Sequence, residues 1–268
     1  MDSREARICI EDVLRTTGRV AIAVSGGVDS MTLAHVAAST PNVDPVIYHA
    51  LSPAVPAEAT ARVERHAAGF SWTLEILNAG EMQDPDYLAN PVNRCFFCKT
   101  NLYGRISGLT DRVILSGANL DDLGDYRPGL EAARNHRVRH PWIEAGIGKP
   151  VIRRLARDLG LDDVAELPAS PCLSSRIETG IPVTRERLAL ISEVEGVVRA
   201  EIGDTTLRCR VRRDGVVVEL EPGALATSGN RLPALLQGVL DRHGVPGPVR
   251  VEAYRRGSAF LRDGARPE

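Results

Sequence analysis

The sequence predicts an α/β protein with a doubly wound, mostly parallel sheet and a smaller α+β domain at its C-terminal end. Through the first half, short apolar runs rich in β-branched residues alternate with segments of helical periodicity. Two of these runs end in small polar turns, where open α/β sheets place their ligands. The last third instead carries a hairpin signal flanked by helical patterns. With 268 residues, the chain can bury one large core or two smaller ones.

The first domain is predicted over residues 1–180. A helix over 2–16 ends at Gly18, and the run 19–24 is typical of a buried parallel strand. A glycine turn and a helix over 31–38 complete the opening strand–turn–helix unit. Further strands are predicted at 46–48, 72–77 and 113–115, with helices over 60–68 and from Lys149 to a stop at Gly160.

The second domain, over residues 181–268, is predicted to serve substrate binding and oligomerisation. Thr184 is a suitable cap for a helix that runs to about residue 199. Strands over 207–213 and 216–221 are joined by Asp214-Gly215, a strong hairpin signal. We expect a helix over 231–243, capped by Asn230, and a last strand over 249–254.

Composition excludes several functional classes. The chain has 33 basic and 35 acidic side chains, and this near-neutral balance argues against a general nucleic-acid binder. Five cysteines are an odd number and too few for a disulfide scaffold. The charged N-terminus and the lack of long apolar runs argue against secretion and membrane spanning. We therefore expect a cytoplasmic protein with reduced thiols.

The turn after the first strand has the chemistry of a phosphate site. Two glycines let the backbone approach an anion, while the serines add hydroxyl donors at the positive end of the following helix. Asp29 is expected to hold a magnesium ion that neutralises the phosphate. The turn is neither a Walker loop nor a dinucleotide turn, and a tight turn without a ligand is the alternative. The predicted ATP-binding residues are Ser25, Gly26, Gly27, Val28, Asp29 and Ser30.

The cysteines form the second chemical signal. Cys95 and Cys98 form a C-x-x-C motif beside Arg94 and Lys99, whose positive charge favours thiolates. Such a pair can be a redox couple, half of a zinc site, ligands of an iron–sulfur cluster, or two packed core thiols. No second C-x-x-C or paired histidine completes a zinc site nearby. A thioredoxin-like redox pair would lie at a strand-to-helix junction, whereas this motif follows a polar loop. Of the others, we interpret Cys9 as a core residue and Cys209 as a strand residue without a chemical role.

Several segments resemble known families. The Ser-Gly-Gly-Val-Asp-Ser turn is similar to the pyrophosphate loop (PP-loop) of N-type ATP pyrophosphatases, Rossmann-like enzymes that cleave ATP between its α and β phosphates. Over about residues 20–220, three segments in order resemble the LarE family of sulfur transferases. They are Asn90-Pro-Val-Asn-Arg-Cys-Phe-Phe-Cys-Lys99, Gly117-Ala-Asn-Leu-Asp-Asp-Leu-Gly-Asp-Tyr-Arg-Pro-Gly129 and Cys172-Leu-Ser-Ser-Arg-Ile-Glu-Thr-Gly180.

The resemblance implies an ATP-dependent reaction on pyridinium-3,5-biscarboxylic acid mononucleotide, which yields the precursor of a nickel-pincer cofactor. Each carboxylate is adenylylated with loss of pyrophosphate, and sulfur then displaces AMP. In one subtype, the cysteine matching Cys172 gives up its own sulfur. In the other, three cysteines hold a [4Fe–4S] cluster with an open iron. Cys95, Cys98 and Cys172 match the three positions, so we predict these residues as the catalytic, cluster-binding set.

An anionic substrate calls for basic residues. Arg208, Arg210 and Arg212 recur at period two on one predicted strand, which is either a solvated edge or an anion-binding face. The resemblance favours binding, because its substrate-phosphate region matches Arg208 and Arg210. Glu219 on the partner strand is expected to bind magnesium or to orient the arginines.

The remaining substrate residues lie beside the cysteines and after the fourth strand. Lys99 and Arg176 are assigned to the substrate, with loop hydrogen bonding as the alternative for Arg176. Asn119 follows the strand 113–115 and is assigned to ATP. Its neighbours Asp121, Asp122 and Asp125 need a neutralising cation, for which Arg127 and Lys99 are candidates. Ser116 departs from the family, where many relatives have aspartate.

Other functions fit less well. An RNA thiolase of the same class usually carries an added RNA-binding or zinc-binding segment, which this chain lacks. An amide-forming synthetase has no use for three cysteines, and a non-enzymatic nucleotide sensor has no need of an intact reactive set. We therefore expect a mononucleotide substrate and a sulfide donor as partners, no nucleic acid or membrane, and assembly into a homo-oligomer.

Overall fold

The structure, a computed structural model, describes residues 1–124, 126–168, 171–203, 205–255 and 257–260. Its contacts divide the chain into two compact units. Unit 1 comprises Met1–Glu81 and Cys95–Ser170, and unit 2 comprises Met82–Arg94 and Pro171–Glu268. The segments 82–94 and 171–180 thus group with unit 2, a finer division than a single boundary near residue 180.

Unit 1 contains a four-stranded parallel sheet, as predicted. Its strands are β1 (Arg19–Val24), β2 (Asp44–Ala50), β3 (Leu74–Leu77) and β4 (Val113–Ser116), in the order β3-β2-β1-β4. Because β1 is the central strand, nearly all its side chains are buried, and this explains its continuous apolar run. The chain leaves β1 toward β2 on one side and later adds β4 on the other, so the order of strands reverses between β1 and β4.

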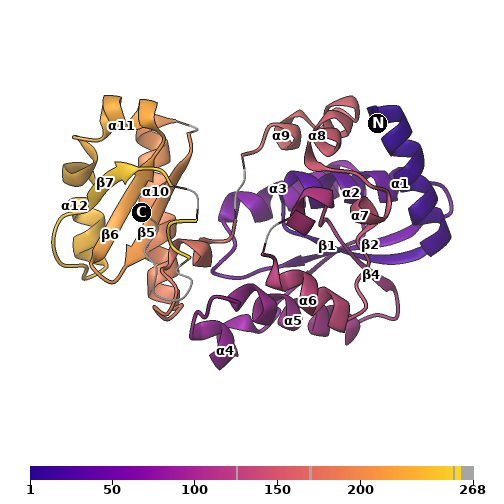
Figure 1. Cartoon of the computed structure of the whole chain (residues 1–268), viewed down its shortest axis with the longest axis horizontal. Helices are drawn as coiled ribbons and strands as arrows, with labels where there is room; N and C mark the ends of the chain where they lie inside the picture. Colours follow the sequence, from indigo (N-terminus) through magenta and orange to yellow (C-terminus); the bar gives the residue numbers. More distant parts are fainter. Residues whose placement is uncertain (125, 169–170, 204, 256, 261–268) are drawn as a thin grey trace. The chain divides into compact units, whose positions relative to one another are not determined.

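Helices cover both faces of this sheet (Figure 1). One face packs against α1 (Ser3–Thr17), α2 (Val28–Ser39), α3 (Ala57–Gly69), α8 (Lys149–Asp158) and α9 (Asp162–Ala165). The other face packs against α5 (Arg94–Ser107) and α6 (Pro128–Asn135). The short α7 (Pro141–Glu144) and the 3-10 turn η2 (Leu120–Gly124) lie between β4 and α8 in the chain.

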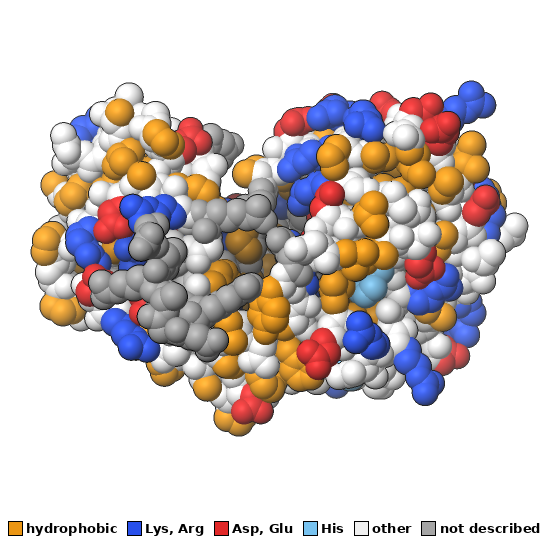
Figure 2. Space-filling model, in the orientation of Figure 1, with side chains coloured by type: hydrophobic (Ala, Val, Ile, Leu, Met, Phe, Trp, Pro, Cys, Tyr) orange, Lys and Arg blue, Asp and Glu red, His pale blue; other side chains and the backbone are white. Residues whose placement is uncertain are grey.

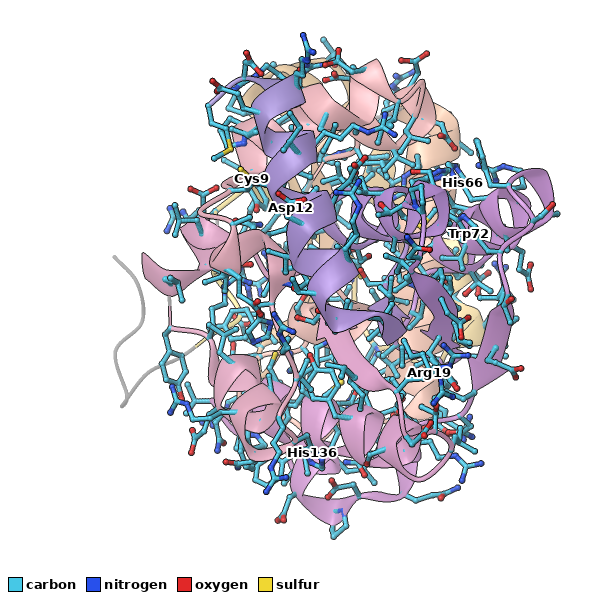
Figure 3. The ribbon with its side chains drawn as sticks, turned by 90° about the vertical axis from the view of Figure 1, so that its right-hand side faces the viewer. Cys9, Asp12, Arg19, His66, Trp72 and His136 are labelled. Carbon is cyan, nitrogen blue, oxygen red and sulfur yellow. The ribbon has the colours of Figure 1, made fainter. Side chains whose placement is uncertain are left out.

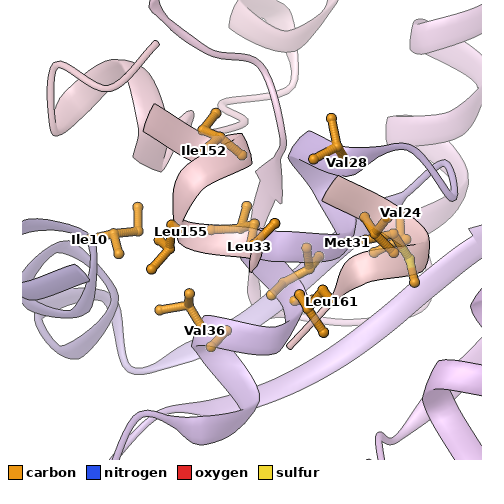
Figure 4. Packing of buried hydrophobic residues seen from close by; sticks show 14 of the residues in the cluster. Ile10, Val24, Val28, Met31, Leu33, Val36, Ile152, Leu155 and Leu161 are labelled. Atoms are coloured by element: carbon orange, nitrogen blue, oxygen red, sulfur yellow. The ribbon is translucent and has the colours of Figure 1, made fainter. Parts of the chain in front are cut away.

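The larger core lies between α1, α2 and α8. Ile10, Leu33 and Leu155 have no exposed surface or almost none and come from these three helices (Figure 4).

α1 begins with a reciprocal capping box in which Asp2 and Glu5 each accept from the other's backbone N–H. Burial of α2 on nearly all sides fixes the turn that precedes it.

A polar chain crosses the edge of this core from α2 to α9. His35 Nε2 lies 2.8 Å from His66 Nδ1, and His66 Nε2 lies 3.1 Å from both carboxylate oxygens of Asp163. Trp72 packs beside both rings, and Figure 3 shows it next to His66. Burial, reinforced by the neighbouring His66, lowers the pKa of His35 to about 4, so the ring is neutral near pH 7.

Unit 2 contains a three-stranded sheet of β5 (Leu207–Arg212), β6 (Gly215–Leu220) and β7 (Arg250–Ala253). β5 and β6 form the predicted antiparallel hairpin, and β7 joins β6 in parallel. α10 (Arg185–Ile202) packs against β5, and Thr184 caps it as predicted. The remaining elements of the unit are the 3-10 turns η1 (Glu81–Gln83), which begins at the last residue of unit 1, and η3 (Leu173–Arg176), with α4 (Pro85–Leu88), α11 (Pro222–Ser228) and α12 (Leu232–Arg242).

Some local predictions are wrong. Arg231 rather than Asn230 occupies the cap position of α12, and no side chain caps that helix. The sequence pattern also misses α11, which starts at Pro222 directly after β6. Cys9 is half-buried, not in the core. Within the described ranges, no helix is long and apolar enough to cross a bilayer.

Candidate active site

The 25–30 turn connects β1 to α2 in a conformation that only glycine tolerates. Gly26 has a φ of +79°, and a Cβ there would lie 2.8 Å from the carbonyl oxygen of Ala59. The Ser30 hydroxyl lies 3.1 Å from the Ser25 backbone nitrogen and 3.3 Å from the Ser25 hydroxyl. The loop is thus folded onto the N-terminus of α2, whose first N–H groups have no partner within the helix. This is the arrangement that binds anions.

Asp29 lies in the first turn of α2 and is mostly buried. Its Oδ1 is buried without a hydrogen-bond partner among the described residues, and its Oδ2 lies 3.2 Å from the Lys149 ammonium. Burial raises the pKa of Asp29, although Lys149 opposes that effect. The Trp142 indole N–H donates to the Asp29 carbonyl oxygen at 3.0 Å and so fixes the backbone of this turn. An unpartnered carboxylate oxygen beside a phosphate loop fits the oxygen ligands that magnesium prefers.

The segment after β4 closes on the same turn. A Cβ at Gly117 would lie 2.7 Å from the Ser30 backbone nitrogen, so only glycine permits this approach. Asn119 is 2 % exposed, and its side chain accepts from the Asp121 N–H at 3.0 Å. The two strands that flank the reversal of strand order therefore end side by side, at the sheet edge for which the sequence predicts the ATP site.

Asp121 and Asp122 of this segment have partners of different kinds, a backbone N–H and a guanidinium. Asp121 accepts from the Lys149 backbone N–H at 2.7 Å and so caps α8, whereas Asp122 pairs with Arg127 at 2.8 Å. Of the two cations expected there, Arg127 thus takes this role. Asp125 lies outside the described residues. Ser116, the departure from the family pattern, lies 2.7 Å from His140 Nδ1.

Cys95 and Cys98 lie in the first turns of α5. Residues three apart share one face of a helix, so both half-buried thiols face the same side. The Lys99 ammonium lies 5.8 Å from the centroid of the Tyr103 ring. The Lys99 side chain also packs closely against Gly129, because a Cβ added there would lie 3.1 Å from it. Arg94 donates to Asn90 and lies 5.9 Å from the Phe260 ring.

In unit 2, Cys172 belongs to a tightly fixed segment, here called the Cys172 turn (residues 171–176). Arg176 is 1 % exposed and donates to the carbonyl oxygens of Pro171 and of Cys172, the latter at 3.1 Å. Its other nitrogens form a bidentate pair with Glu195 of α10, at 2.9 and 3.0 Å. Arg176 therefore positions Cys172, and its predicted contact with substrate stays a prediction.

The arginine strand β5 runs beside this turn. Ile177 bridges to Val211, and Arg210 donates to the Ser175 carbonyl at 3.1 Å. Arg208 and Arg210 are 8 % and 4 % exposed, so the alternative of a solvated edge is wrong for these two residues. Burial, together with the charge of the nearby Arg176, lowers the pKa of Arg208. A bound anion would relieve this crowding of positive charge.

Glu219 lies under the same arginines. Its side chain is fully buried and pairs with Arg210 at 2.8 Å and with Arg212 at 2.7 Å. Ser258 donates to it at 2.6 Å. Of the two predicted roles, orienting the arginines has direct contacts behind it, while magnesium binding by Glu219 stays a prediction.

The predicted site residues thus form three groups. The 25–30 turn, Asn119 and Asp121 come together in unit 1, Cys95 and Cys98 share α5, and Cys172 lies with the arginines in unit 2. Within either unit alone, the described side chains include no group of three His, Cys, Asp or Glu placed to hold a metal. The sequence interpretation missed Lys149 and Glu195. Lys149 carries a signal, since it is one of only two lysines, whereas nothing in the helix pattern singles out Glu195.

Comparison with known proteins gives distant relatives. An uncharacterized protein of Synechocystis sp. is 36% identical over 208 residues, which cover 76% of this chain and 77% of that protein. An uncharacterized protein of Methanocaldococcus jannaschii is 24% identical over 76% of the chain and 78% of its own length. The pyridinium-3,5-bisthiocarboxylic acid mononucleotide synthase of Lactiplantibacillus plantarum is 28% identical over 77% of the chain and 76% of its own length. A scan against models of known protein families gives no match.

Proposed function

Because the chain belongs to the family of the Synechocystis protein and is a distant homologue of the Lactiplantibacillus synthase, we propose that it is an ATP-dependent sulfur transferase. Its substrate is pyridinium-3,5-biscarboxylic acid mononucleotide, and its product carries thiocarboxylates in place of the carboxylates. The observation that supports the proposal is the Cys172 turn, which carries a half-buried thiol and whose Ser175 carbonyl accepts a hydrogen bond from the buried Arg210 of β5.

The first half-reaction is adenylylation. A substrate carboxylate oxygen attacks the α-phosphorus of ATP, the bond to the bridging oxygen breaks, and pyrophosphate leaves. The backbone N–H groups and hydroxyls of the 25–30 turn bind the departing phosphates. Magnesium, when bound through Asp29, screens their charge. Asn119 follows Gly117, which approaches this turn closely, and we assign it to the nucleotide site.

The second half-reaction brings sulfur to the acyl-adenylate and releases AMP. The desolvated Arg208 and Arg210 suit the phosphate of the mononucleotide, because buried guanidinium groups bind such oxygens in pairs. Lys99 adds a compact positive charge on the thiol-bearing helix α5. Glu219 and Arg176 act through their neighbours: Glu219 orients Arg210 and Arg212, and Arg176 holds the Cys172 backbone.

For the sulfur source, we propose a [4Fe–4S] cluster held by Cys95, Cys98 and Cys172. Three half-buried thiols are soft donors of the kind that iron–sulfur clusters take, and two of them share one helix face. When bound, the cluster supplies sulfide through an iron that has no protein ligand. The alternative within the same reaction is that Cys172 donates its own sulfur, loses its α-proton and becomes dehydroalanine.

Anaerobic purification followed by iron and acid-labile sulfide analysis tests the cluster. About four irons per chain that fall to background in Cys95→Ala support it, whereas an active, iron-free protein refutes it. The mass of the protein after turnover then separates the sources. A loss of the elements of hydrogen sulfide at Cys172 indicates sacrifice, and an unchanged mass with more than one product per chain indicates a catalyst.

Pyrophosphate release tests the reaction class. The chain is incubated with ATP and magnesium, with the pyridinium mononucleotide or with unmodified tRNA as acceptor. Release only with the mononucleotide supports the proposal. Release only with tRNA identifies an RNA thiolase and refutes it.

A further inference from the structure

The Lys149 ammonium occupies the place where a metal is expected. It lies 3.2 Å from Asp29 Oδ2, while Asp29 Oδ1 is buried and has no hydrogen-bond partner within the described part of the chain. The backbone of Lys149 is fixed independently, because Asp121 caps α8 at this residue. A Cβ at the preceding Gly148 would lie 3.1 Å from the Asp121 carboxylate, so a larger residue would disturb the cap. The ammonium can therefore change partner while its helix stays in place.

The choice of lysine at this position is unusual for the chain. Only 2 of its 33 basic residues are lysines, Lys99 and Lys149, and the rest are arginines. An ammonium is a compact point charge on a flexible stem, whereas a guanidinium is a rigid, planar fork. A cation that must move between a carboxylate and a phosphate oxygen is better served by the compact group.

A basic depression extends from Lys149 along α8. It has an open volume of about 660 Å³ and is lined by Asp121, Lys149, Pro150, Arg153, Arg154 and Arg157. Arg153 donates to the carbonyl oxygens of Ala165 and Leu167, which carry no full charge. Arg157 instead pairs with Glu166 at 2.6 Å. Figure 2 shows Lys and Arg side chains gathered where Figure 1 places α8 and α9.

We propose that this depression receives the two terminal phosphates of ATP, and that Lys149 moves from Asp29 to these phosphates when magnesium binds Asp29. The inference rests on the proposed ATP-dependent function and adds to it a second phosphate-binding element, outside the 25–30 turn. In the absence of nucleotide, Lys149 compensates the Asp29 charge. With nucleotide, the metal compensates Asp29, and Lys149 with Arg153 compensates the group that leaves as pyrophosphate.

Amine footprinting tests the movement of Lys149 directly. With only two lysines, acetylation followed by mass spectrometry reports each ammonium separately. Magnesium pyrophosphate is the probe, and calorimetry on the same sample verifies its binding. We expect Lys149 to be acetylated at least fivefold more slowly in the complex, with Lys99 changed less than twofold. Unchanged acetylation of Lys149 in a saturated complex overturns the inference and leaves the proposed function standing.

Affinity for pyrophosphate gives an independent test. Lys149→Met is expected to weaken binding about tenfold in the presence of magnesium, but less than twofold in EDTA, where the wild-type ammonium remains on Asp29. Lys149→Arg keeps the charge and should recover only part of the loss. The control is Arg15→Met on α1, which removes an exposed cation paired with Glu11 and Asp12.

The outcomes distinguish the two proposals. Equal losses for Lys149→Met with and without magnesium refute the exchange of partners. A wild-type chain that binds neither ATP nor pyrophosphate refutes the inference and the proposed function together. Circular dichroism and a thermal melt of each variant verify that the fold is intact, so that lost affinity reports the site.

Discussion

Glu195→Gln tests whether the Arg176–Glu195 pair is what fixes the Cys172 turn. Arg176 and Glu195 are 1 % and 3 % exposed, and two nearly parallel hydrogen bonds join them. Glu195 also accepts from the Cys209 N–H at 3.0 Å, which ties β5 to α10. The glutamine has the same shape but no charge, so Arg176 would stay buried without a counter-ion.

The expected cost follows from burial. Breaking a buried ion pair by removing one partner costs about 3–5 kcal/mol, because the remaining charge is left uncompensated. Glutamine still offers one oxygen acceptor, so we expect the lower end, about 3 kcal/mol. The matched control is Glu193→Gln on the same helix, whose pairs with Arg242 and His243 are half-exposed. Exposed pairs contribute about 0–1 kcal/mol.

Urea unfolding followed by circular dichroism measures both losses. A thiol reagent at Cys172 supplies a second readout, since release of the Arg176 guanidinium frees the carbonyl oxygens of Pro171 and Cys172. We expect faster modification of Cys172 in Glu195→Gln and no change in Glu193→Gln. Equal stabilities of the two variants, or an unchanged rate at Cys172, would refute the assigned positioning role.

Three further predictions follow from single contacts. Gly26→Ala should destabilise the protein by about 2 kcal/mol in thermal melts, because the new Cβ meets Ala59 in a left-handed backbone, whereas Gly27→Ala meets only an ordinary contact at 3.5 Å. His35 has its pKa lowered to about 4 by burial, so unfolding takes up a proton between pH 6.5 and 4 and stability falls by about 2 kcal/mol over that window; urea titrations of His35→Gln should show a weaker pH dependence, and equal slopes would contradict it. Cys209 is fully buried and its pKa is raised by burial, so peptide mapping after alkylation at pH 8 should find it unmodified in the native protein and modified in urea.

Much of the fold was predictable because its signals are local. The apolar run of β1, the glycines of the 25–30 turn and the Asp214-Gly215 hairpin each act within a few residues, and each is confirmed. The error at Asn230 has the same origin, because a good capping residue is no guarantee that the helix starts after it. The start of α12 is displaced by Arg231, which continues the turn from α11 in helical backbone conformation.

The candidate site was predictable only where one motif supplies its residues. Arg176 illustrates the limit, since a guanidinium next to a reactive cysteine suggests catalysis, while its buried partner Glu195 lies 19 residues further on. Lys149 lies 120 residues from Asp29, and only the fold brings the two charges within 3.2 Å. Such pairs depend on tertiary packing, about which local periodicity carries no information.

The two proposed phosphate-binding elements of unit 1, the 25–30 turn and the depression along α8, differ in the groups that they offer to a phosphate. The 25–30 turn offers rigid backbone donors, because it packs closely against Ala59 and Gly117 and accepts a hydrogen bond from Trp142. Such preorganised donors stabilise charge that develops on the phosphate oxygens, but they carry no full positive charge to offset the net charge of pyrophosphate. In the proposed exchange, Lys149 leaves Asp29 and supplies that positive charge together with Arg153. In this proposal the departing phosphates are bound both by the backbone of the 25–30 turn and by side chains of α8. Changes at Arg153 are therefore expected to weaken pyrophosphate binding, as Lys149→Met does.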